Sequence, residues 1–259
     1  MFEAMMIAAT GIAHQQRRLD TIADNVANVN TVGFKESRLD FKDALYTAGM
    51  GPAPAYTPDG NLQKGHGVLV SAITKDFRMG SLSPTGSPLD FAIEGDAFFE
   101  LMNPDEGLLY TRAGNMYISN EDDAAYIVNS DGYYLHNEDG ERIVIPAGSY
   151  ETSVARDGTI TFYGEQSSVV GTDKIGLFTF TNNTGLANVG SSNYEVTPAS
   201  GEKMLAENAS LIQGSLEMSN VDLAGEMTRL IRTQRAFSLA SRALTTADDM
   251  EGIANNIRR

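Results

Sequence analysis

The sequence contains no cysteine and only three histidines among its 259 residues. Without cysteine there is no disulfide, no thiolate metal site and no cysteine nucleophile, and three histidines exclude most zinc chemistry. Long apolar runs are also missing, because none approaches the roughly 18 residues that a membrane-spanning helix needs. These absences exclude a disulfide-stabilised fold and an integral membrane protein.

Catalytic signatures are absent as well. The chain has no Gly-x-Ser-x-Gly, no P-loop and no dinucleotide-binding fingerprint. His14, His66 and His136 lack the spacing of metal ligands. An acidic cluster does not match the spacing of a calcium-binding loop, so we expect a solvated surface there; its members are Glu121, Asp122, Asp123, Asp131, Glu138, Asp139 and Glu141. We therefore expect no enzyme, no cofactor and no bound metal.

Basic residues are outnumbered, and the formal net charge at pH 7 is −15. A nucleic-acid binder normally carries a basic surface, so this balance argues against one. The acidic excess is confined to residues 76–220, which hold 22 acidic and 6 basic residues. Residues 1–75 hold seven of each, and residues 221–259 hold five acidic and six basic. Two nearly neutral ends enclose a strongly acidic middle.

The N-terminal segment has the pattern of a long helix. From Glu3 to about Asn28 there is no proline, and apolar or small residues recur at alternating intervals of three and four, with Gln15 at the one missing position, which is typical of a coiled-coil seam. Asn28, Asn30 and Gly33 are the predicted stop. The seam consists of Met5, Ala8, Ile12, Leu19, Ile22, Val26 and Val29.

A second helix is predicted from Val221 to Arg259, with Ser219 as its N-cap and Asp222 three residues on. Its apolar face is double width, so it must contact several neighbours at once. One stripe consists of Met227, Leu230, Phe237, Ala240, Leu244 and Ala247. The other consists of Ala236, Leu239, Ala243, Met250, Ile253 and Ile257.

Four arginines follow the same helix at intervals of three, three and seven residues. They are Arg229, Arg232, Arg235 and Arg242. The helix carries too little net positive charge to favour nucleic acid. We therefore expect the arginines to form salt bridges with neighbouring carboxylates or hydrogen bonds with helix-end carbonyls.

Between the helices, short segments rich in β-branched and aromatic residues predict strands. These segments are residues 68–73, 89–93, 97–102, 126–128, 142–145, 159–162, 175–180 and 194–197. Asp-Gly pairs predict turns, and they begin at Asp59, Asp131, Asp139 and Asp157. The stretch Tyr46–Gly67, which is rich in proline and glycine, is predicted to be an extended loop.

Together these patterns predict an α+β protein. The N- and C-terminal α-helices form a coiled-coil-like domain, and an antiparallel all-β domain, a sandwich or an irregular barrel, is inserted between them. We place the terminal helical domain at residues 1–32 and 220–259, an extended linker at 33–75 and the β-rich domain at 76–219.

The wide apolar faces of the terminal helices favour self-assembly. Contacts with further copies would be heterologous, and repeating such contacts gives a ring or an open helical polymer. Two alternatives stay open. The helices could form an intramolecular core, or the chain could be a soluble adhesin or binding module that presents its function on the β surface.

Both ends of the chain also resemble a known family. The run IADNVANVNTVGFK over residues 22–35 is similar to the N-terminal signature of bacterial flagellar rod and hook proteins. The C-terminal signature is matched by SNVD at 219–222, QRAF at 234–237 and TAD at 246–248. Internal runs, LDFAI at 89–93 and YTRAG at 110–114, occur in the family's order. The motif residues singled out are Asn25, Asn28, Asn30, Gly33, Phe34, Ser219, Asn220, Gln234 and Arg235.

The resemblance implies a structural subunit of the basal-body rod, which spans the cell envelope. The chain would be exported unfolded by the flagellar type III apparatus without a cleaved signal peptide. It would self-assemble into a helical polymer and contact other rod and hook proteins and the surrounding L- and P-ring bushing. Neither nucleic acid nor membrane insertion is implied.

In this picture the terminal helices form an inner coiled-coil tube and the β domain an outer layer. Length, a single β domain and the stretch Tyr46–Gly67 resemble distal-rod members of the family, with proximal-rod members as the alternative. The expected axial contacts are Met5, Ala8, Ile12, Leu19, Ile22, Val26, Met227, Leu230, Phe237, Ala240, Leu244 and Ala247.

Overall fold

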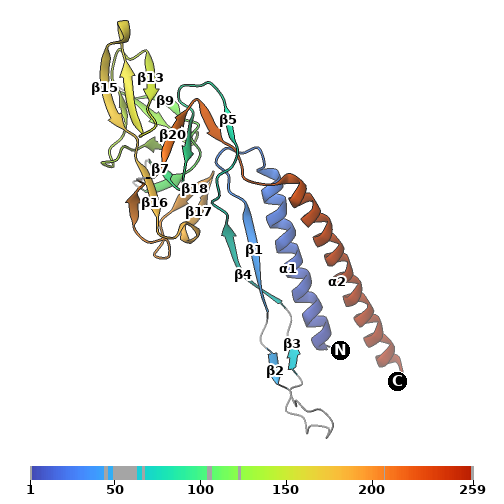
Figure 1. Cartoon of the computed structure of the whole chain (residues 1–259). Coiled ribbons are helices and arrows are strands. Elements are labelled where there is room, and N and C mark those ends of the chain that lie inside the picture. Colours follow the sequence, from blue (N-terminus) through green and yellow to red (C-terminus); the bar gives the residue numbers. More distant parts are fainter. Residues whose placement is uncertain are drawn as a thin grey trace. The chain divides into compact units, whose positions relative to one another are not determined.

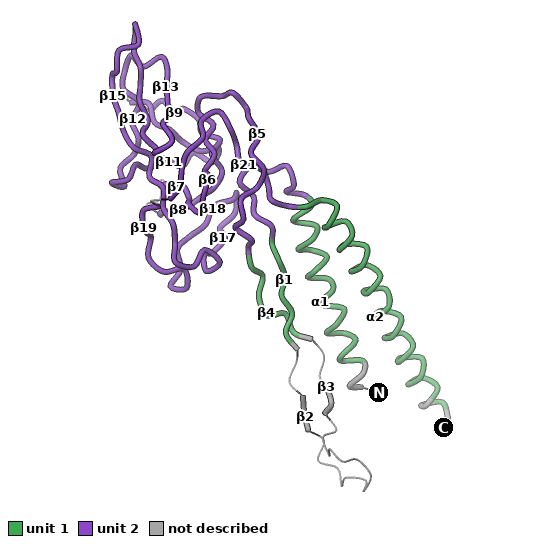
Figure 2. The backbone as a smooth tube through the Cα atoms, in the orientation of Figure 1, with its two compact units in different colours: residues 1–26, 37–74, 222–259 green, residues 27–36, 75–221 purple. Residues whose placement is uncertain are grey.

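The computed structural model describes residues 2–43, 46–48, 63–65, 68–103, 107–121, 124–206 and 208–257. The chain divides into two compact units, coloured in Figure 2. Unit 1 consists of residues 1–26, 37–74 and 222–259, and unit 2 consists of residues 27–36 and 75–221. Each unit is therefore assembled from segments that lie far apart in the sequence.

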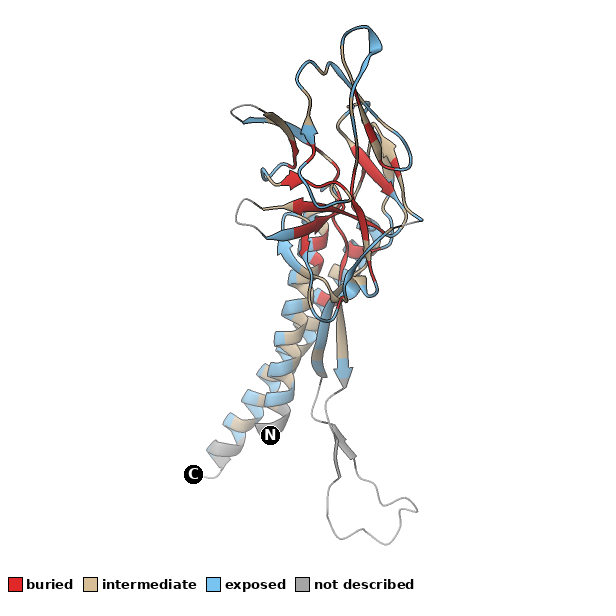
Figure 3. Ribbon diagram, turned by 90° about the vertical axis from the view of Figure 1, so that its left-hand side faces the viewer, coloured by how far each residue is buried: buried red, intermediate tan, exposed pale blue. Residues whose placement is uncertain are grey.

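Unit 1 contains the two long helices, α1 (Phe2–Ala27) and α2 (Leu223–Ile257) (Figure 1). Both predicted helices are confirmed, and the chain turns after Ala27, as the asparagine-rich sequence predicts. The coiled-coil pairing of the two helices stays a prediction. Most described side chains on both helices are half-buried or exposed (Figure 3).

The N-cap of α2 differs from the prediction. The helix begins after Asp222, whose carboxylate Oδ1 accepts a hydrogen bond from the Ala224 N–H at 3.1 Å. Ser219 lies three residues too early, and its hydroxyl instead accepts from the Val221 N–H at 3.3 Å. The reason is that the chain before Asp222 belongs to unit 2, where Asn220 is held by other hydrogen bonds.

Unit 1 also contains two small sheets. β1 (Ser37–Asp43) pairs with β4 (Val68–Lys75), whose last residue belongs to unit 2, and β2 (Tyr46–Ala48) pairs antiparallel with β3 (Gln63–Gly65). β4 confirms the strand predicted at 68–73, whereas β1 was not predicted. The predicted extended loop at Tyr46–Gly67 is therefore paired through β2 and β3. The rest of that loop, including the turn predicted at Asp59, lies outside the described residues.

Unit 2 is the predicted antiparallel β domain. Its main sheet has ten strands, with the path β12-β10-β11-β7-β8-β18-β17 and with β16, β19 and β9 paired off this path. These strands are β7 (Phe98–Met102), β8 (Leu108–Thr111), β9 (Tyr117–Glu121), β10 (Ala124–Val128), β11 (Tyr134–Leu135), β12 (Val144–Ile145), β16 (Leu177–Phe180), β17 (Ala187–Gly190), β18 (Asn193–Glu195) and β19 (Lys203–Leu205).

Smaller sheets complete the unit. β13 (Glu151–Val154), β14 (Thr159–Tyr163) and β15 (Val169–Lys174) form a three-stranded sheet. β6 (Phe91–Glu94) pairs with β20 (Ser210–Gln213), and β5 (Leu82–Pro84) pairs with β21 (Ser215–Glu217). Short 3-10 helices lie at Glu165–Ser167 and Asn183–Gly185. All the predicted strand segments contain a strand, although the one predicted at 194–197 ends at Glu195.

Three of the predicted Asp-Gly turns are confirmed. Gly132, Gly140 and Gly158 adopt φ angles of 84°, 80° and 89°, a left-handed region that favours glycine. In each turn the glycine N–H donates to a carbonyl three residues earlier. The sequence signal was reliable here because the turn chemistry is local.

The core of unit 2 has two parts, on the two sides of β7. Phe99 joins an aliphatic cluster that also includes Leu101, Ile127 and Phe162, whereas Phe98 joins an aromatic cluster. Neighbouring strand residues point to opposite faces, so the paired phenylalanines serve both clusters. The aromatic cluster consists of Phe77, Phe98, Tyr110, Phe178, Phe180 and Tyr194.

A buried carboxylate, Glu100, follows the paired phenylalanines. Its oxygens lie 3.1 Å from His136 Nδ1, 2.7 Å from Lys203 Nζ and 2.8 Å from the Tyr110 hydroxyl. Burial alone would raise the pKa of Glu100, but these hydrogen bonds outweigh it and lower the pKa from 4.5 to about 2.

Because its pKa is lower in the folded state, Glu100 stabilises the fold fully above pH 4.5 and loses this contribution as the pH falls toward 2. We expect Glu100→Gln to cost about 2 kcal/mol at pH 7, the scale of charge-assisted hydrogen bonds, and progressively less below pH 4.5. Denaturant unfolding followed at several pH values checks this. Glu195→Gln, on the exposed end of β18, is the control and should change little. A cost that does not depend on pH would contradict the assignment.

Candidate assembly site

The first polar site joins the end of α1 to the start of β1 within unit 1. Asn25 is 1% exposed. Its side chain accepts from the Ser37 N–H at 2.8 Å and donates to the Ser37 carbonyl at 2.9 Å, so the amide pairs with the backbone as a neighbouring strand would. This pairing satisfies both backbone groups of Ser37 at the first position of β1.

The same asparagine reaches the first turn of α2. Its Nδ2 lies 3.4 Å from Oε2 of Glu226, which is buried and also forms an ion pair with Arg229. Glu226 is in the first turn of α2, where a negative charge is favoured by the helix dipole. The two motif-bearing ends of the sequence therefore meet at Asn25 and Glu226.

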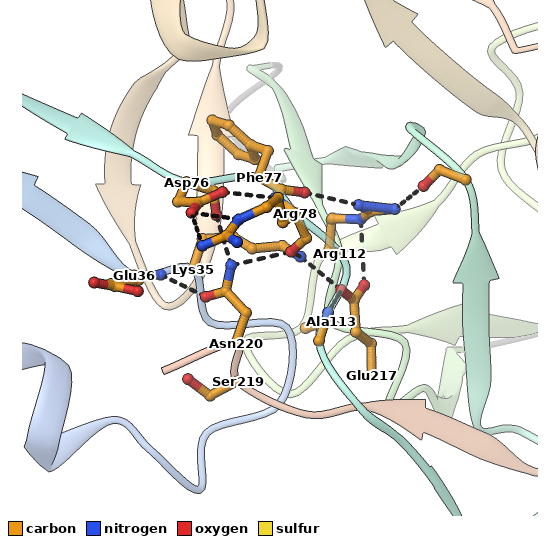
Figure 4. A network of polar contacts seen from close by, with 12 residues as sticks. Lys35, Glu36, Asp76, Phe77, Arg78, Arg112, Ala113, Glu217, Ser219 and Asn220 are labelled. Atoms are coloured by element: carbon orange, nitrogen blue, oxygen red, sulfur yellow. Dashed lines mark hydrogen bonds and ion pairs between the residues drawn. The ribbon is translucent and has the colours of Figure 1, made fainter. Parts of the chain in front are cut away.

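The second polar site lies in unit 2 and is built around Glu217, the last residue of β21. One carboxylate oxygen lies 2.6 Å from Lys35 Nζ and accepts from the Gly80 N–H at 2.8 Å. The other lies 3.3 Å from Arg112 Nε. Figure 4 shows Glu217 facing both cations. All three charged side chains are at most 1% exposed, so this is a buried charge network.

Further hydrogen bonds from both cations go to backbone carbonyls. Lys35 Nζ donates to the Arg78 carbonyl at 2.8 Å, and the Arg112 guanidinium donates to the carbonyls of Gly95 and Phe77. Desolvation lowers the pKa of Lys35, and the adjacent Glu217 opposes that effect. The network contains two cations and one anion, so Glu217 offsets only part of their combined charge.

Asn220 ties the C-terminal signature to two other segments of unit 2. Its Oδ1 accepts from the Glu36 N–H at 2.7 Å, and its Nδ2 donates to the carbonyls of Asp76 and Arg78 at 2.8 and 3.0 Å (Figure 4). All three hydrogen-bonding partners are backbone groups. An aspartate of the same shape would place a carboxylate against two carbonyls, so the amide is required.

Gly33 allows the N-terminal signature to approach this network. Its φ is +66°, and a Cβ at this position would lie 2.5 Å from the Ala113 backbone nitrogen. Its N–H donates to the Glu217 carbonyl at 2.8 Å. Gly33 was predicted as a helix stop, but its close packing beside the YTRAG run could not be read from local sequence.

The motif residues singled out from the sequence fall into three groups. Asn25 and Asn220 form the contacts above, and Gly33, Phe34 and Ser219 are buried. Asn28 and Asn30 lie in the turn after α1, where the Thr31 hydroxyl donates to Asn28 Oδ1 at 3.1 Å. Gln234 and Arg235 are exposed on α2. The sequence did not predict Glu217 or the role of Arg112. The only sequence signal is that Glu217 lies two residues before the SNVD motif and that Arg112 lies within the YTRAG run.

The expected axial-contact residues lie along α1 and α2. Ile22 is buried and Met227 is exposed. The others are half-buried: Met5, Ala8, Ile12, Leu19, Val26, Leu230, Phe237, Ala240, Leu244 and Ala247. Their role in copy-to-copy contacts stays a prediction.

The arginines of α2 correct one expectation. Arg229 pairs with Glu226, as predicted. For Arg232, Arg235 and Arg242 the described residues supply no ion pair and no side-chain hydrogen bond. Carboxylates are missing from the intervening turns because no acidic residue occurs between Glu226 and Asp248.

Other kinds of site find little support in the part of the chain that the structure describes. A groove of about 440 Å³ in unit 1 is lined by Arg18, Asn25, Phe41 and Glu226, among others. Two of these residues, Asn25 and Glu226, form the hydrogen bond between α1 and α2 described above. Within the described ranges, no cluster of three or more acidic or histidine side chains is arranged to hold a metal. None of the described helix segments is both long and apolar enough to cross a membrane.

Comparison with known families assigns all three regions that carry these contacts. Residues 5–35 match the family described as flagella basal body rod protein. Residues 92–162 match the flagellar hook protein FlgE/F/G D1 domain, and residues 212–257 match the flagellar basal body rod FlgEFG protein C-terminal family. Asn25 and Lys35, then Arg112, then Glu217 and Glu226 fall in these three regions in turn.

Individual relatives match along the entire chain. The flagellar basal-body rod proteins FlgG of Borreliella burgdorferi and of Bacillus subtilis are each 36% identical, with 100% of this chain and of the relative covered. The flagellar hook-basal body complex protein FlhP of Bacillus subtilis is 29% identical, also with complete coverage of both chains.

Because removing one partner leaves buried charges uncompensated, we expect Glu217→Gln to destabilise unit 2 by about 3–5 kcal/mol. The matched control is Glu138→Gln, since Glu138 pairs with Lys174 at 2.6 Å but both side chains are partly exposed. It should cost no more than about 1 kcal/mol. Denaturant unfolding of the two variants measures both costs. Equal costs would show that the buried network does not stabilise the fold.

Proposed function

This chain belongs to the flagellar basal-body rod protein family and is a structural subunit of the rod, and from that premise we propose that it builds the distal rod. In this proposal many copies polymerise helically through their terminal helices. The resulting shaft transmits motor torque to the hook. The mechanism is mechanical, because the subunit acts by resisting torsion.

The single observation that carries the proposal is the exposed apolar surface of α2. Leu239, Ile253 and Met250 are 66%, 60% and 56% exposed, and Leu223, Met227 and Ile231 are exposed as well. A monomer in water rarely leaves so many large apolar side chains along one element. These residues follow more than one side of the helix, so several neighbouring copies are needed to cover them.

The hydrogen bond between Asn25 and Glu226 supports the same function. It links the last turn of α1 to the first turn of α2, while the remaining turns of both helices are mostly half-buried or exposed. A polymer can then bury these turns between copies. We propose residues 1–32 and 220–259 as the inner tube and residues 76–219 as its outer layer.

The charge distribution fits that arrangement. Residues 76–220 hold the acidic excess, whereas the two ends are nearly neutral. Neutral ends can pack closely without accumulating like charge, and a charged outer layer stays solvated. We propose that this layer turns within the L- and P-ring bushing, and that the type III apparatus exports the chain without a cleaved signal peptide.

The assignment to the distal rod follows the relatives, because those at 36% identity carry the name FlgG. A proximal-rod role is the alternative within the family. Electron microscopy of basal bodies from a strain that lacks this chain separates the two, since the distal or the proximal segment of the rod will be missing.

Leu244 tests the role of the helices. We expect Leu244→Asp to prevent rod assembly and abolish swimming, because a carboxylate would be buried among apolar side chains at every copy-to-copy contact. Swimming and electron microscopy of basal bodies, in a strain whose own copy is deleted, measure the effect.

Val189→Asp provides the matched control, since Val189 is an exposed apolar residue on β17 in unit 2. It should leave the rod intact. Normal rods in Leu244→Asp would reject the axial-contact role. Circular dichroism of both purified variants establishes that the β domain is still folded.

A further inference from the structure

Three arginines of α2 form an exposed basic face. Arg232, Arg235 and Arg242 are separated by three and seven residues, which are close to whole turns, so they lie on one side of the helix. None has an ion-pair partner among the described residues. Ile231 and Leu239, 51% and 66% exposed, lie among them. We call Ile231, Arg232, Arg235, Leu239 and Arg242 the arginine face.

The end of the same helix carries the complementary set. Asp248 and Glu251 are three residues apart and lie about half a turn around the helix from the arginines. They too have no ion-pair partner in the described part of the chain. Met250 and Ile253 in the same turns are exposed, but they lie on the side of the arginines. We call Asp248 and Glu251 the acidic end.

The acidic end lies near the C-terminal end of α2. α2 has 35 residues and α1 has 26, so at 1.5 Å per residue α2 is about 13 Å longer. The helices are held together near Asn25 and Glu226, so the extra length lies at the other end of α2 (Figure 1). About two turns of α2 therefore extend past the start of α1, where a second copy can reach them.

We propose that the acidic end of α2 in one copy docks on the arginine face of α2 in a second copy. This contact rests on the proposed polymerisation and identifies the two surfaces that pair. The occupant is argued from charge complementarity, since each surface carries charges of one sign that have no ion-pair partner among the described residues. The two surfaces differ and lie on opposite sides of the helix, so the contact is heterologous and can repeat without closing on a dimer.

The contact would fix the axial offset between neighbouring copies more than it would strengthen their association. A single exposed ion pair contributes little, but like charges placed opposite each other are repelled at every copy-to-copy contact. Apolar side chains alone tolerate sliding along a helix. Charges at fixed positions permit one axial offset between neighbouring copies.

Charge exchange tests the proposal in the full-length chain. The first variant is Arg232→Glu with Arg235→Glu, the second is Asp248→Arg with Glu251→Arg, and the third combines all four changes. We expect each of the first two to raise the protein concentration needed for polymerisation at least about tenfold, and the combined variant to restore most of it. Sedimentation of purified polymer and swimming of a complemented deletion strain measure the effects.

Asp249→Arg is the matched control. Asp249 follows Arg242 by seven residues and so lies on the side of the arginines. The same charge reversal there should leave polymerisation within about twofold of the unmodified chain. A 1:1 mixture of the first two variants should also polymerise, because each supplies the surface that complements the other.

The outcomes separate the two proposals. If the unmodified chain restores rods and the charge variants assemble equally well, the docking contact is wrong and the rod function stands. The docking contact is also wrong if the combined variant and the mixture fail while each variant keeps its helical circular dichroism. If the unmodified chain does not restore rods, the rod function itself is wrong.

Discussion

The pairing of Glu217 with Lys35 and Arg112 is the interaction on which the rest of the structure depends. A buried carboxylate between two buried cations is favourable only when further hydrogen bonds offset the loss of water. Backbone groups of residues 77–80 and 95 supply such hydrogen bonds, while Arg112 Nε and Glu217 Oε2 face each other as an ion pair at 3.3 Å. These segments are distant in sequence, so the network can form only when they have come together in the folded unit 2.

The hydrogen bonds of Asn220 also explain how one chain can pass repeatedly between two units. The chain crosses from one unit to the other at residues 36/37, 74/75 and 221/222, among other places. On the unit 2 side of these crossings, Asn220 binds the Glu36 N–H and the Asp76 carbonyl, and the Asp76 N–H donates to the Glu36 carbonyl at 2.9 Å. The chain segments next to β1, β4 and α2 are thus bound to one another on the unit 2 side of these crossings.

Local patterns predicted the elements of this fold well and their junctions poorly. The helices, the strands and the Asp-Gly turns follow from periodicity and turn chemistry within a few residues. β1 and the Asp222 cap were not predicted because they depend on tertiary contacts. Asn25 accepts from the Ser37 N–H at the start of β1. Asn220, just before the cap of α2, accepts from the Glu36 N–H. The ion pair of Lys35 with Glu217 joins positions 182 residues apart, a separation that no spacing rule spans.

The two units satisfy their side chains to different degrees, and in the proposed assembly this difference supplies the driving force for a rod. Unit 2 encloses aliphatic and aromatic clusters and pairs its most buried charges internally. α2 in unit 1 leaves both aliphatic side chains and arginines without partners in the described chain. Apolar burial gives strength in proportion to area, whereas charge placement gives one register. A shaft under torsion needs both, because strong contacts without a fixed register would slip.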